Sequence, residues 1–270
     1  FYLILENIHR LLNMVDIFKT LFSKFKNTSD YIKPVFWTFG KKYKIAAVHQ
    51  YEVSDLDGSG YKPSPHPVQM TWKLEGAERA YEHFGPPFLL TTSSLYQKIR
   101  NIQLRILPDD VLLAIEVSKY DQKVVLEALH NCIAHQDYTR NGRILVVEML
   151  DRLIFENEGS FYEGQPNDYI AGNKTPRKYR NPFLVQAMTE LNMIDTMGYG
   201  IYEMHLGQAR RYFPLPDYDL SDNSSVKMTI YGSVVDPAYS RLLIQKTDLS
   251  WEDILLLDRV QKNYLYQMML

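Results

Sequence analysis

The spacing of hydrophobic residues changes several times along the chain, and each change predicts a different element. The first segment, FYLILENIHRLLNMVDIFKTLFSKF, has apolar residues at helical spacing over several turns. Residues 27–50 carry short apolar runs that predict strands. Two further helices are predicted at GAERAYEHF (76–84), which Gly85-Pro86-Pro87 would end, and at SSLYQKIRN (93–101), where a serine can cap the first turn.

The pattern is sharper after residue 120. A helix is predicted over 121–136, and a hairpin follows in which GRILVVEML and LIFENEG are joined at Asp151-Arg152. The polar stretch 160–181 is long enough to be typical of a lid or binding loop. The remaining predicted elements are helices at 182–194 and 201–213, a strand at 225–232 and a helical stretch from Ala238. We therefore expect an α/β (α+β) fold in which helices cover a mixed or mostly antiparallel sheet.

Breaks in the pattern indicate how the chain is divided. GSGYKPSPHP (58–67) combines glycines and prolines and is a predicted boundary. The predicted segments are an N-terminal helical and strand remnant (1–57), a connecting region (58–120), the main domain (121–235) and a C-terminal helical segment (236–270). Because the chain begins at Phe1 rather than Met and ends within an apolar run, we expect it to be part of a longer protein.

Composition excludes several classes of protein. Of the 270 residues, 46% are apolar and 23% are charged, which is typical of a folded globular protein. With 30 basic and 32 acidic side chains the net charge is -2, so only a local patch could favour nucleic acid. The single cysteine, Cys132, excludes a disulfide framework and a multi-cysteine metal site. No apolar run approaches the roughly 20 residues of a membrane span, and we expect a cytoplasmic protein with no membrane partner.

The sequence LEALHNCIAHQDY (126–138) places an acid, an amide and a histidine four residues apart. Residues four apart on a helix differ by only about 40° of rotation, so Glu127, Asn131 and His135 line one stripe. An apolar stripe that includes Cys132 lies beside it, which predicts an inert core cysteine. Most amphipathic helices carry such a polar face merely because it is solvated, so this helix alone does not identify a site.

Four segments together carry a resemblance to a known family: EALHNCIAHQDY, RILVVEMLDRLIFENEGSF, TPRKYRNPFLVQAM and MIDTMGYGI. They resemble the divergent ATPase domain, of the gyrase, heat-shock chaperone and histidine-kinase (GHKL) class, in bacterial transcriptional regulators often labelled ATP-dependent DNA helicase, RecG-related. The resemblance is strong over 124–216 and weaker elsewhere from Phe39 onwards. It implies a Bergerat-like ATP-binding sandwich. It also implies that DNA would be bound by flanking domains that are absent here, and that the C-terminal segment 236–270 leads to a truncated winged helix.

The resemblance assigns roles at the phosphate end of an ATP site. Glu127 would orient the attacking water, and Asn131 would supply an oxygen to Mg²⁺. Gly198 and Gly200 precede a helix closely enough to let backbone N–H groups and the helix dipole approach phosphate. A triphosphate also requires further positive charge, which the loop cations Lys174 and Arg180, with Arg177 and Lys178, could supply if that loop is the ATP lid. A glycine pair alone is equally typical of an ordinary helix start.

At the base end the sequence departs from the family pattern. Asn157, followed by Glu158 and Gly159, stands where the class has an aspartate that accepts the adenine amino group, and Phe161 replaces the second glycine of that motif. His135 is included among the nucleotide contacts; the alternatives are a pair with Asp137 or a local hydrogen bond at the helix end. Solvated surface loops explain the lid cations equally well without the resemblance.

The favoured interpretation is an ATP-binding regulatory module of a DNA-binding protein, with slow Mg²⁺-dependent hydrolysis if any. A degenerate fold that serves as a dimerisation or interaction scaffold is the main alternative, and direct contact with nucleic acid is the third; a homodimer is left open. No Gly-x-x-x-x-Gly-Lys-Ser/Thr motif occurs, so the chain does not encode a P-loop helicase motor. Zinc-hydrolase spacing and a Gly-x-Ser-x-Gly elbow are also absent.

Overall fold

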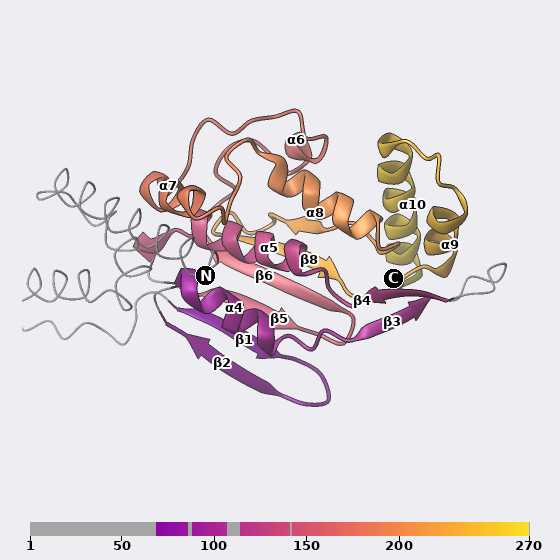
Figure 1. The fold of residues 1–270 in the computed structure, drawn as a ribbon, viewed down its shortest axis with the longest axis horizontal. Helices are drawn as coiled ribbons and strands as arrows, with labels where there is room; N and C mark the ends of the chain where they lie inside the picture. The colour runs from indigo at the N-terminus through magenta and orange to yellow at the C-terminus, as the bar shows by residue number, and fades with distance from the viewer. Residues whose placement is uncertain (1–68, 86–87, 107–113, 141, 270) are drawn as a thin grey trace, which may run out of the picture.

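A six-stranded sheet with helices packed on one face forms the centre of the computed structural model, which describes residues 69–85, 88–106, 114–140 and 142–269 (Figure 1). The strand order is β2-β1-β5-β6-β8-β7. The strands are β1 (Met70–Leu74), β2 (Ala80–Phe84), β5 (Ile144–Glu148), β6 (Arg152–Glu158), β7 (Asp217–Asp219) and β8 (Ser225–Tyr231). Only β1 and β5 pair in parallel among these. The predicted mostly antiparallel sheet covered by helices is confirmed.

The helix predicted at 76–84 is wrong. Its second half is the edge strand β2, which pairs antiparallel with β1 from Met70↔Phe84 to Leu74↔Ala80. A nine-residue segment is too short to be stable as an isolated helix, so pairing with a neighbouring strand decides its conformation. The helix predicted at 93–101 exists but begins earlier, as α4 (Phe88–Lys98), and its serines therefore lie inside the helix rather than at its cap.

The remaining predicted helices are found in the predicted order. They are α5 (Gln122–His135), α7 (Pro182–Glu190), α8 (Tyr199–Ala209), α9 (Pro237–Gln245) and α10 (Trp251–Met269). The short helix α6 (Asn167–Ile170) was not predicted, because it lies in the stretch 160–181 that was expected to be a loop. A short 3-10 turn (Tyr138–Arg140) follows α5. A small antiparallel pair, β3 (Gln103–Ile106) and β4 (Ile115–Ser118), stands apart from the main sheet and was not predicted. In Figure 1, α4, α5 and α8 lie across the same side of the main sheet.

The predicted hairpin is formed by β5 and β6. Along β6 the residues alternate between buried and partly exposed, so that Leu153, Phe155 and Asn157 face the helices. The turn lies one residue earlier than predicted: the Met149 N–H donates to the Arg152 carbonyl at 2.9 Å, which leaves Leu150 and Asp151 as the two turn residues. Neither has a positive φ, so the turn does not require the glycine that a type I′ turn prefers.

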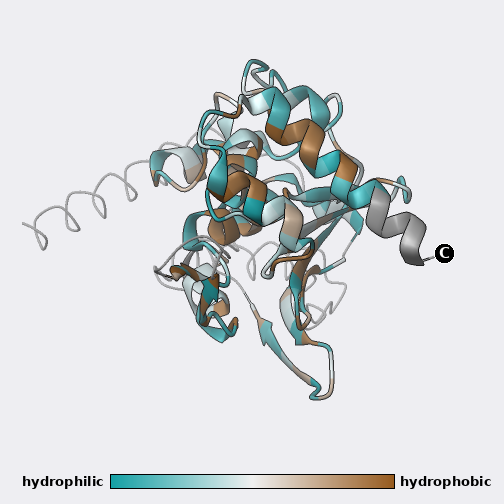
Figure 2. Ribbon diagram, turned by 90° about the vertical axis from the view of Figure 1, so that its right-hand side faces the viewer, coloured by the Kyte–Doolittle hydropathy of each residue, from teal (hydrophilic) through white to brown (hydrophobic). Residues whose placement is uncertain are grey.

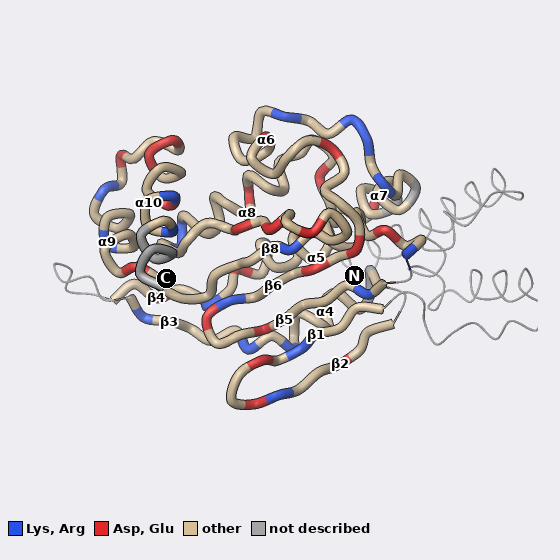
Figure 3. Tube along the Cα trace, turned by 180° about the vertical axis from the view of Figure 1, so that it is seen from behind, with Lys and Arg blue, Asp and Glu red and all other residues tan. Residues whose placement is uncertain are grey.

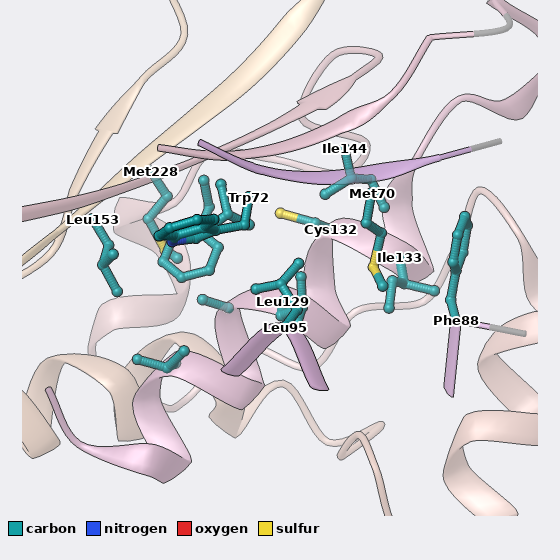
Figure 4. Packing of buried hydrophobic residues seen from close by; sticks show 14 of the residues in the cluster. Met70, Trp72, Phe88, Leu95, Leu129, Cys132, Ile133, Ile144, Leu153 and Met228 are labelled. Carbon is teal, nitrogen blue, oxygen red and sulfur yellow. The ribbon is translucent and has the colours of Figure 1, made fainter. Parts of the chain in front are cut away.

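Helix α5 fills the space above the centre of the sheet. Leu129, Cys132 and Ile133 project from α5 toward Met70 and Trp72 (Figure 4), and all five are buried. Burial raises the pKa of the Cys132 thiol to about 12, so the thiol stays neutral and acts as a core side chain. The apolar stripe predicted for this helix is therefore confirmed.

The C-terminal helices pack at one end of the sheet. Hydrophobic and hydrophilic residues alternate along α10, which ends at the label C in Figure 2. The buried Asp258 of α10 accepts a hydrogen bond from the Leu215 N–H at 2.9 Å, and Lys262 pairs with Asp217 at 2.7 Å. These polar contacts join α10 to the segment that enters β7.

The predicted domain boundaries stay predictions. Segment 1–57, with its expected helix and strands, lies outside the described residues. Strands β1 and β2 fall in the predicted connecting region yet share one sheet with β5. Within the described part of the chain, no helix is both long enough and apolar enough to cross a membrane.

Candidate functional site

The polar stripe of α5 is held in place by the helix around it. Asp121 caps the helix by accepting hydrogen bonds from the N–H groups of Lys123 and Val124 at 2.8 and 3.1 Å. Glu127 and Asn131 are both half-buried, and Asn131 Nδ2 donates to Glu127 Oε1 at 3.0 Å. Since the amide nitrogen of Asn131 is used in this way, its Oδ1 is the atom left for a ligand.

Glu127 lies directly against the first turn of α8. A β-carbon built at Gly200 would lie 2.0 Å from Glu127 Oε1, so any side chain there would displace the carboxylate. Burial raises the pKa of Glu127, and the nearby Asp195 and Glu203 raise it further, whereas the hydrogen bond from Asn131 lowers it. The structure thus brings Glu127, Asn131 and Gly200 together at a helix N-terminus.

The turn before α8 depends on a second glycine. Gly198 has a φ of 89°, and a β-carbon there would lie 2.5 Å from the Lys174 carbonyl oxygen. Both the left-handed backbone and the close approach of the loop require glycine. Asp195 accepts hydrogen bonds from the N–H groups of Met197 and Tyr199 at 3.0 and 3.2 Å. An acid that was absent from our candidate residues therefore occupies this helix start.

The end of β6 forms the other half of the candidate site. Asn157 is 5% exposed and its Nδ2 donates to the Glu158 carbonyl at 3.1 Å. This bond leaves Oδ1 as the acceptor, as the resemblance requires. Gly159 has a φ of 97°, and a β-carbon there would lie 2.9 Å from Asp137 Cβ and 3.0 Å from Arg180 Cζ. Phe161 packs its ring on Tyr169 and Tyr218.

Two amides that were not predicted connect α5 to this strand end. Gln136 is fully buried; its Oε1 accepts from the Glu158 N–H at 2.9 Å and its Nε2 donates to the Gly142 carbonyl at 3.1 Å. Asn181 Nδ2 donates to the carbonyls of Ala134 and Gln136 at 3.0 and 2.8 Å. These bonds fix the C-terminal end of α5. The only signal in the sequence is an amide just beyond a helix end, which is too common to single out.

The basic side chains of the predicted lid, Ser160 to Asn181, pair with acids inside and outside the loop. Lys174 Nζ bonds Asp168 of the lid at 2.6 Å, whereas Arg180 stacks on Tyr162 and lies 3.5 Å from Asp137, just after α5. In Figure 3 the basic positions of this segment run along the chain between α6 and α7, with acidic positions nearby. Arg177 and Lys178 have exposed side chains.

His135 ends the polar stripe without the partners we considered. Its ring stacks on Tyr179 with centroids 6.2 Å apart, and its buried Nδ1 has no hydrogen-bond partner among the residues that the structure describes. Asp137 instead pairs with Arg140 and Arg180. Burial, and then the charge of Arg180, lower the pKa of His135 to about 4, so the ring is neutral near pH 7. Tyr179 OH donates to the Thr196 carbonyl at 3.0 Å and so links the lid to the turn before α8.

His205 on α8 predicts a pH effect on stability. Burial lowers its pKa from 6.5 to about 4. Between these values the unfolded chain binds a proton that the folded protein does not, so stability is complete above pH 6.5 and is lost as pH falls toward 4. We expect His205→Phe, which keeps a ring against Tyr218, to lose about 2 kcal/mol less than the parent between pH 7 and 4.5 in urea unfolding. The exposed His83→Phe is the control, and equal pH dependence in all three would contradict this assignment.

At the start of α8, Asn131 and Glu127 offer the side-chain oxygens that a metal ion could use. Across the residues that the structure describes, no group of three or more His, Cys, Asp or Glu side chains could hold a metal ion. Mg²⁺ bound with a nucleotide needs only one or two protein oxygens, because phosphates and water complete its octahedron. The Asn131 amide oxygen beside a carboxylate fits this donor set.

Part of the chain matches a known protein family. A family model described as "Putative ATP-dependent DNA helicase recG C-terminal" matches residues 134–230. Residues 134–230 are thus similar to this RecG C-terminal, ATPase-like family. The matched range contains the β5–β6 hairpin, the lid, α7, α8 and all of β8 except Tyr231, whereas Glu127 and Asn131 lie just before it. This match confirms, over residues 134–230, the resemblance found in the sequence.

A solved structure also resembles the chain. The DIP2311 protein from Corynebacterium diphtheriae, a structural-genomics target, matches 62% of this chain with a TM-score of 0.49 and 18% sequence identity. The match covers 35% of that protein, so the chain spans about a third of its length. No sequence among the curated proteins matches this chain.

Proposed function

We propose that this domain binds ATP together with Mg²⁺ between α5, the start of α8, the end of β6 and the lid. One observation carries the proposal: the hydrogen-bonded Glu127–Asn131 pair lies against Gly200, in the first turn of α8. A helix N-terminus favours phosphate, and an acid and an amide beside it are the groups needed to orient water and to contact Mg²⁺. The RecG C-terminal family match of the adjoining residues supports this interpretation.

Hydrolysis, if it occurs, depends on Glu127. Burial raises the pKa of this carboxyl, which brings it closer to the range in which a general base is effective. Asn131 would hold the Glu127 carboxylate in position through its Nδ2 and present Oδ1 to Mg²⁺, which when bound would neutralise charge on the phosphates. We expect slow turnover, because the lid is held by contacts of its own.

The base would lie at the end of β6, where Asn157 Oδ1 can accept a hydrogen bond from the adenine amino group. His135 and Gly159 lie on the elements that meet there, and Lys174 and Arg180 would contact phosphate after the lid rearranges. For the whole protein, we propose that it is a cytoplasmic DNA-binding transcriptional regulator and that this domain is its regulatory module. The matched family is described as the C-terminal part of a putative ATP-dependent DNA helicase. DNA would be bound by flanking domains. We also propose that the protein forms a homodimer.

The first test is calorimetric titration of ATP with and without Mg²⁺ on the parent and on Asn131→Ala. We expect Mg²⁺-dependent binding in the parent and at least about tenfold weaker binding in the variant. The variant loses the Asn131 oxygen that would contact Mg²⁺ and the hydrogen bond to Glu127, so binding of both Mg²⁺ and ATP should weaken. Asn263→Ala, which removes an exposed amide on α10, is the control for general effects of amide loss.

Absence of ATP binding in the parent would favour the scaffold alternative. The specific observation on that side is Asn157, a neutral amide where the family has a charged acceptor. In that case the fold would serve assembly, and sedimentation of the parent protein would be the next measurement.

A further inference from the structure

In this protein, internal carboxylates bind several of the groups that a phosphate would need. Glu163 Oε2 accepts hydrogen bonds from the consecutive N–H groups of Arg177 and Lys178 at 2.9 and 2.8 Å. Successive backbone N–H groups that converge on one point form an anion-binding nest. The lid therefore contains such a nest, and it is filled by an acid of the same loop.

A second carboxylate neutralises the lid lysine. Asp168 Oδ2 lies 2.6 Å from Lys174 Nζ and also accepts from the Gln165 N–H at 3.0 Å. Lys174 Nζ also lies 4.8 Å from the centroid of the Tyr169 ring, a cation–π contact within the same loop. The charge of Lys174 is thus satisfied within the loop while no phosphate is present.

A third carboxylate sits at the helix start that the proposed phosphate site requires. Asp195 bonds the N–H groups of Met197 and Tyr199, on either side of Gly198. The backbone carbonyl of Lys174 packs against Gly198, so the lid and the α8 turn are in direct contact. The three acids therefore bind donors in one continuous region, which consists of the lid and the turn before α8.

We propose that Glu163, Asp168 and Asp195 form an acidic latch that holds the lid and the α8 turn closed on themselves until a phosphate-bearing ligand displaces the carboxylates. This inference rests on the proposed function, because the competing anion is the nucleotide phosphate. Both the carboxylate and a phosphate oxygen are charged acceptors for the same donors, so only one can occupy each position. The latch lowers the affinity for nucleotide, and the lid is released only when nucleotide binds.

The test combines binding with lid cleavage in the full chain. Glu163→Ala removes both acceptor oxygens from an exposed loop, and Asp168→Asn is an independent second variant. Glu190→Ala is the matched control, since this exposed acid at the end of α7 has no ion pair among the described residues. We expect ATP to bind about three- to tenfold more tightly to Glu163→Ala and Asp168→Asn than to the control, with affinity for adenosine unchanged.

Trypsin supplies a measurement that does not depend on ATP. Cleavage after Lys174, Arg177 and Lys178, followed by mass spectrometry, should be faster in ligand-free Glu163→Ala than in the parent, and tripolyphosphate should protect the lid. Unchanged cleavage together with unchanged ATP affinity, or an equal gain for adenosine, would overturn the latch while leaving ATP binding intact. No ATP binding in any variant, but faster cleavage and protection by tripolyphosphate, would retain the latch and remove the proposed function.

Discussion

Glu127→Gln is expected to slow ATP hydrolysis by about 10²–10⁴-fold, the usual contribution of a positioned general base. Glutamine keeps the length of the side chain and an oxygen that can accept the Asn131 hydrogen bond. It cannot take a proton from water. We therefore expect ATP affinity, measured by calorimetry, to change by no more than a few-fold while the single-turnover rate falls.

The pH profile of the parent separates a base from a structural acid. Burial, with Asp195 and Glu203 as further causes, raises the pKa of Glu127, so the unprotonated carboxylate is lost at higher pH than for an ordinary glutamate. The rate should rise with pH through this raised pKa, and Glu203→Gln should move the rise toward lower pH. Glu190→Gln is the control for loss of one negative charge. A Glu127→Gln variant that hydrolyses ATP at the parent rate would remove Glu127 from catalysis.

The parts of this molecule that were predictable depend on local periodicity. Glu127 and Asn131 share a stripe because residues four apart on any α-helix do so, whatever the helix packs against. Likewise, the alternation in LIFENEG sets which side chains of β6 face the helices. These patterns identify the surfaces of an element without knowledge of its neighbours.

The parts that were missed depend on contacts between distant segments. GAERAYEHF has helix-forming residues, but its partner strand β1 decides that Ala80–Phe84 is extended. Glu163 binds backbone N–H groups 14 and 15 residues further along the chain. Every residue except proline has a backbone N–H, so the sequence does not indicate which of them will bind a carboxylate. Gln136 and Asn181 likewise join carbonyls whose positions only the folded chain determines. The interior of the lid could therefore not be predicted.

Leu129→Ala is expected to reduce the free energy of unfolding by about 2–5 kcal/mol, because it leaves a cavity beneath α5 that the surrounding structure cannot fill completely. Leu129 is fully buried. In the sequence it lies between the site residues Glu127 and Asn131, but its side chain is on the opposite side of α5. Urea unfolding followed by circular dichroism measures the loss. Leu150→Ala provides the matched control, since Leu150 is 84% exposed at the β5–β6 turn and its truncation should change stability by less than about 0.5 kcal/mol.

The same pair of variants connects the core to the site. Glu127 and Asn131 are positioned by α5, and α5 is positioned by Leu129 and its neighbours against the sheet, so the cavity should also weaken Mg²⁺-dependent ATP binding under conditions where Leu129→Ala remains folded. Leu129→Met, which restores most of the volume, should recover stability to within about 1.5 kcal/mol of the parent and restore binding with it. Equal losses of stability in Leu129→Ala and Leu150→Ala would show that α5 is not seated on the sheet as described, and the site geometry derived from that helix would then be wrong as well.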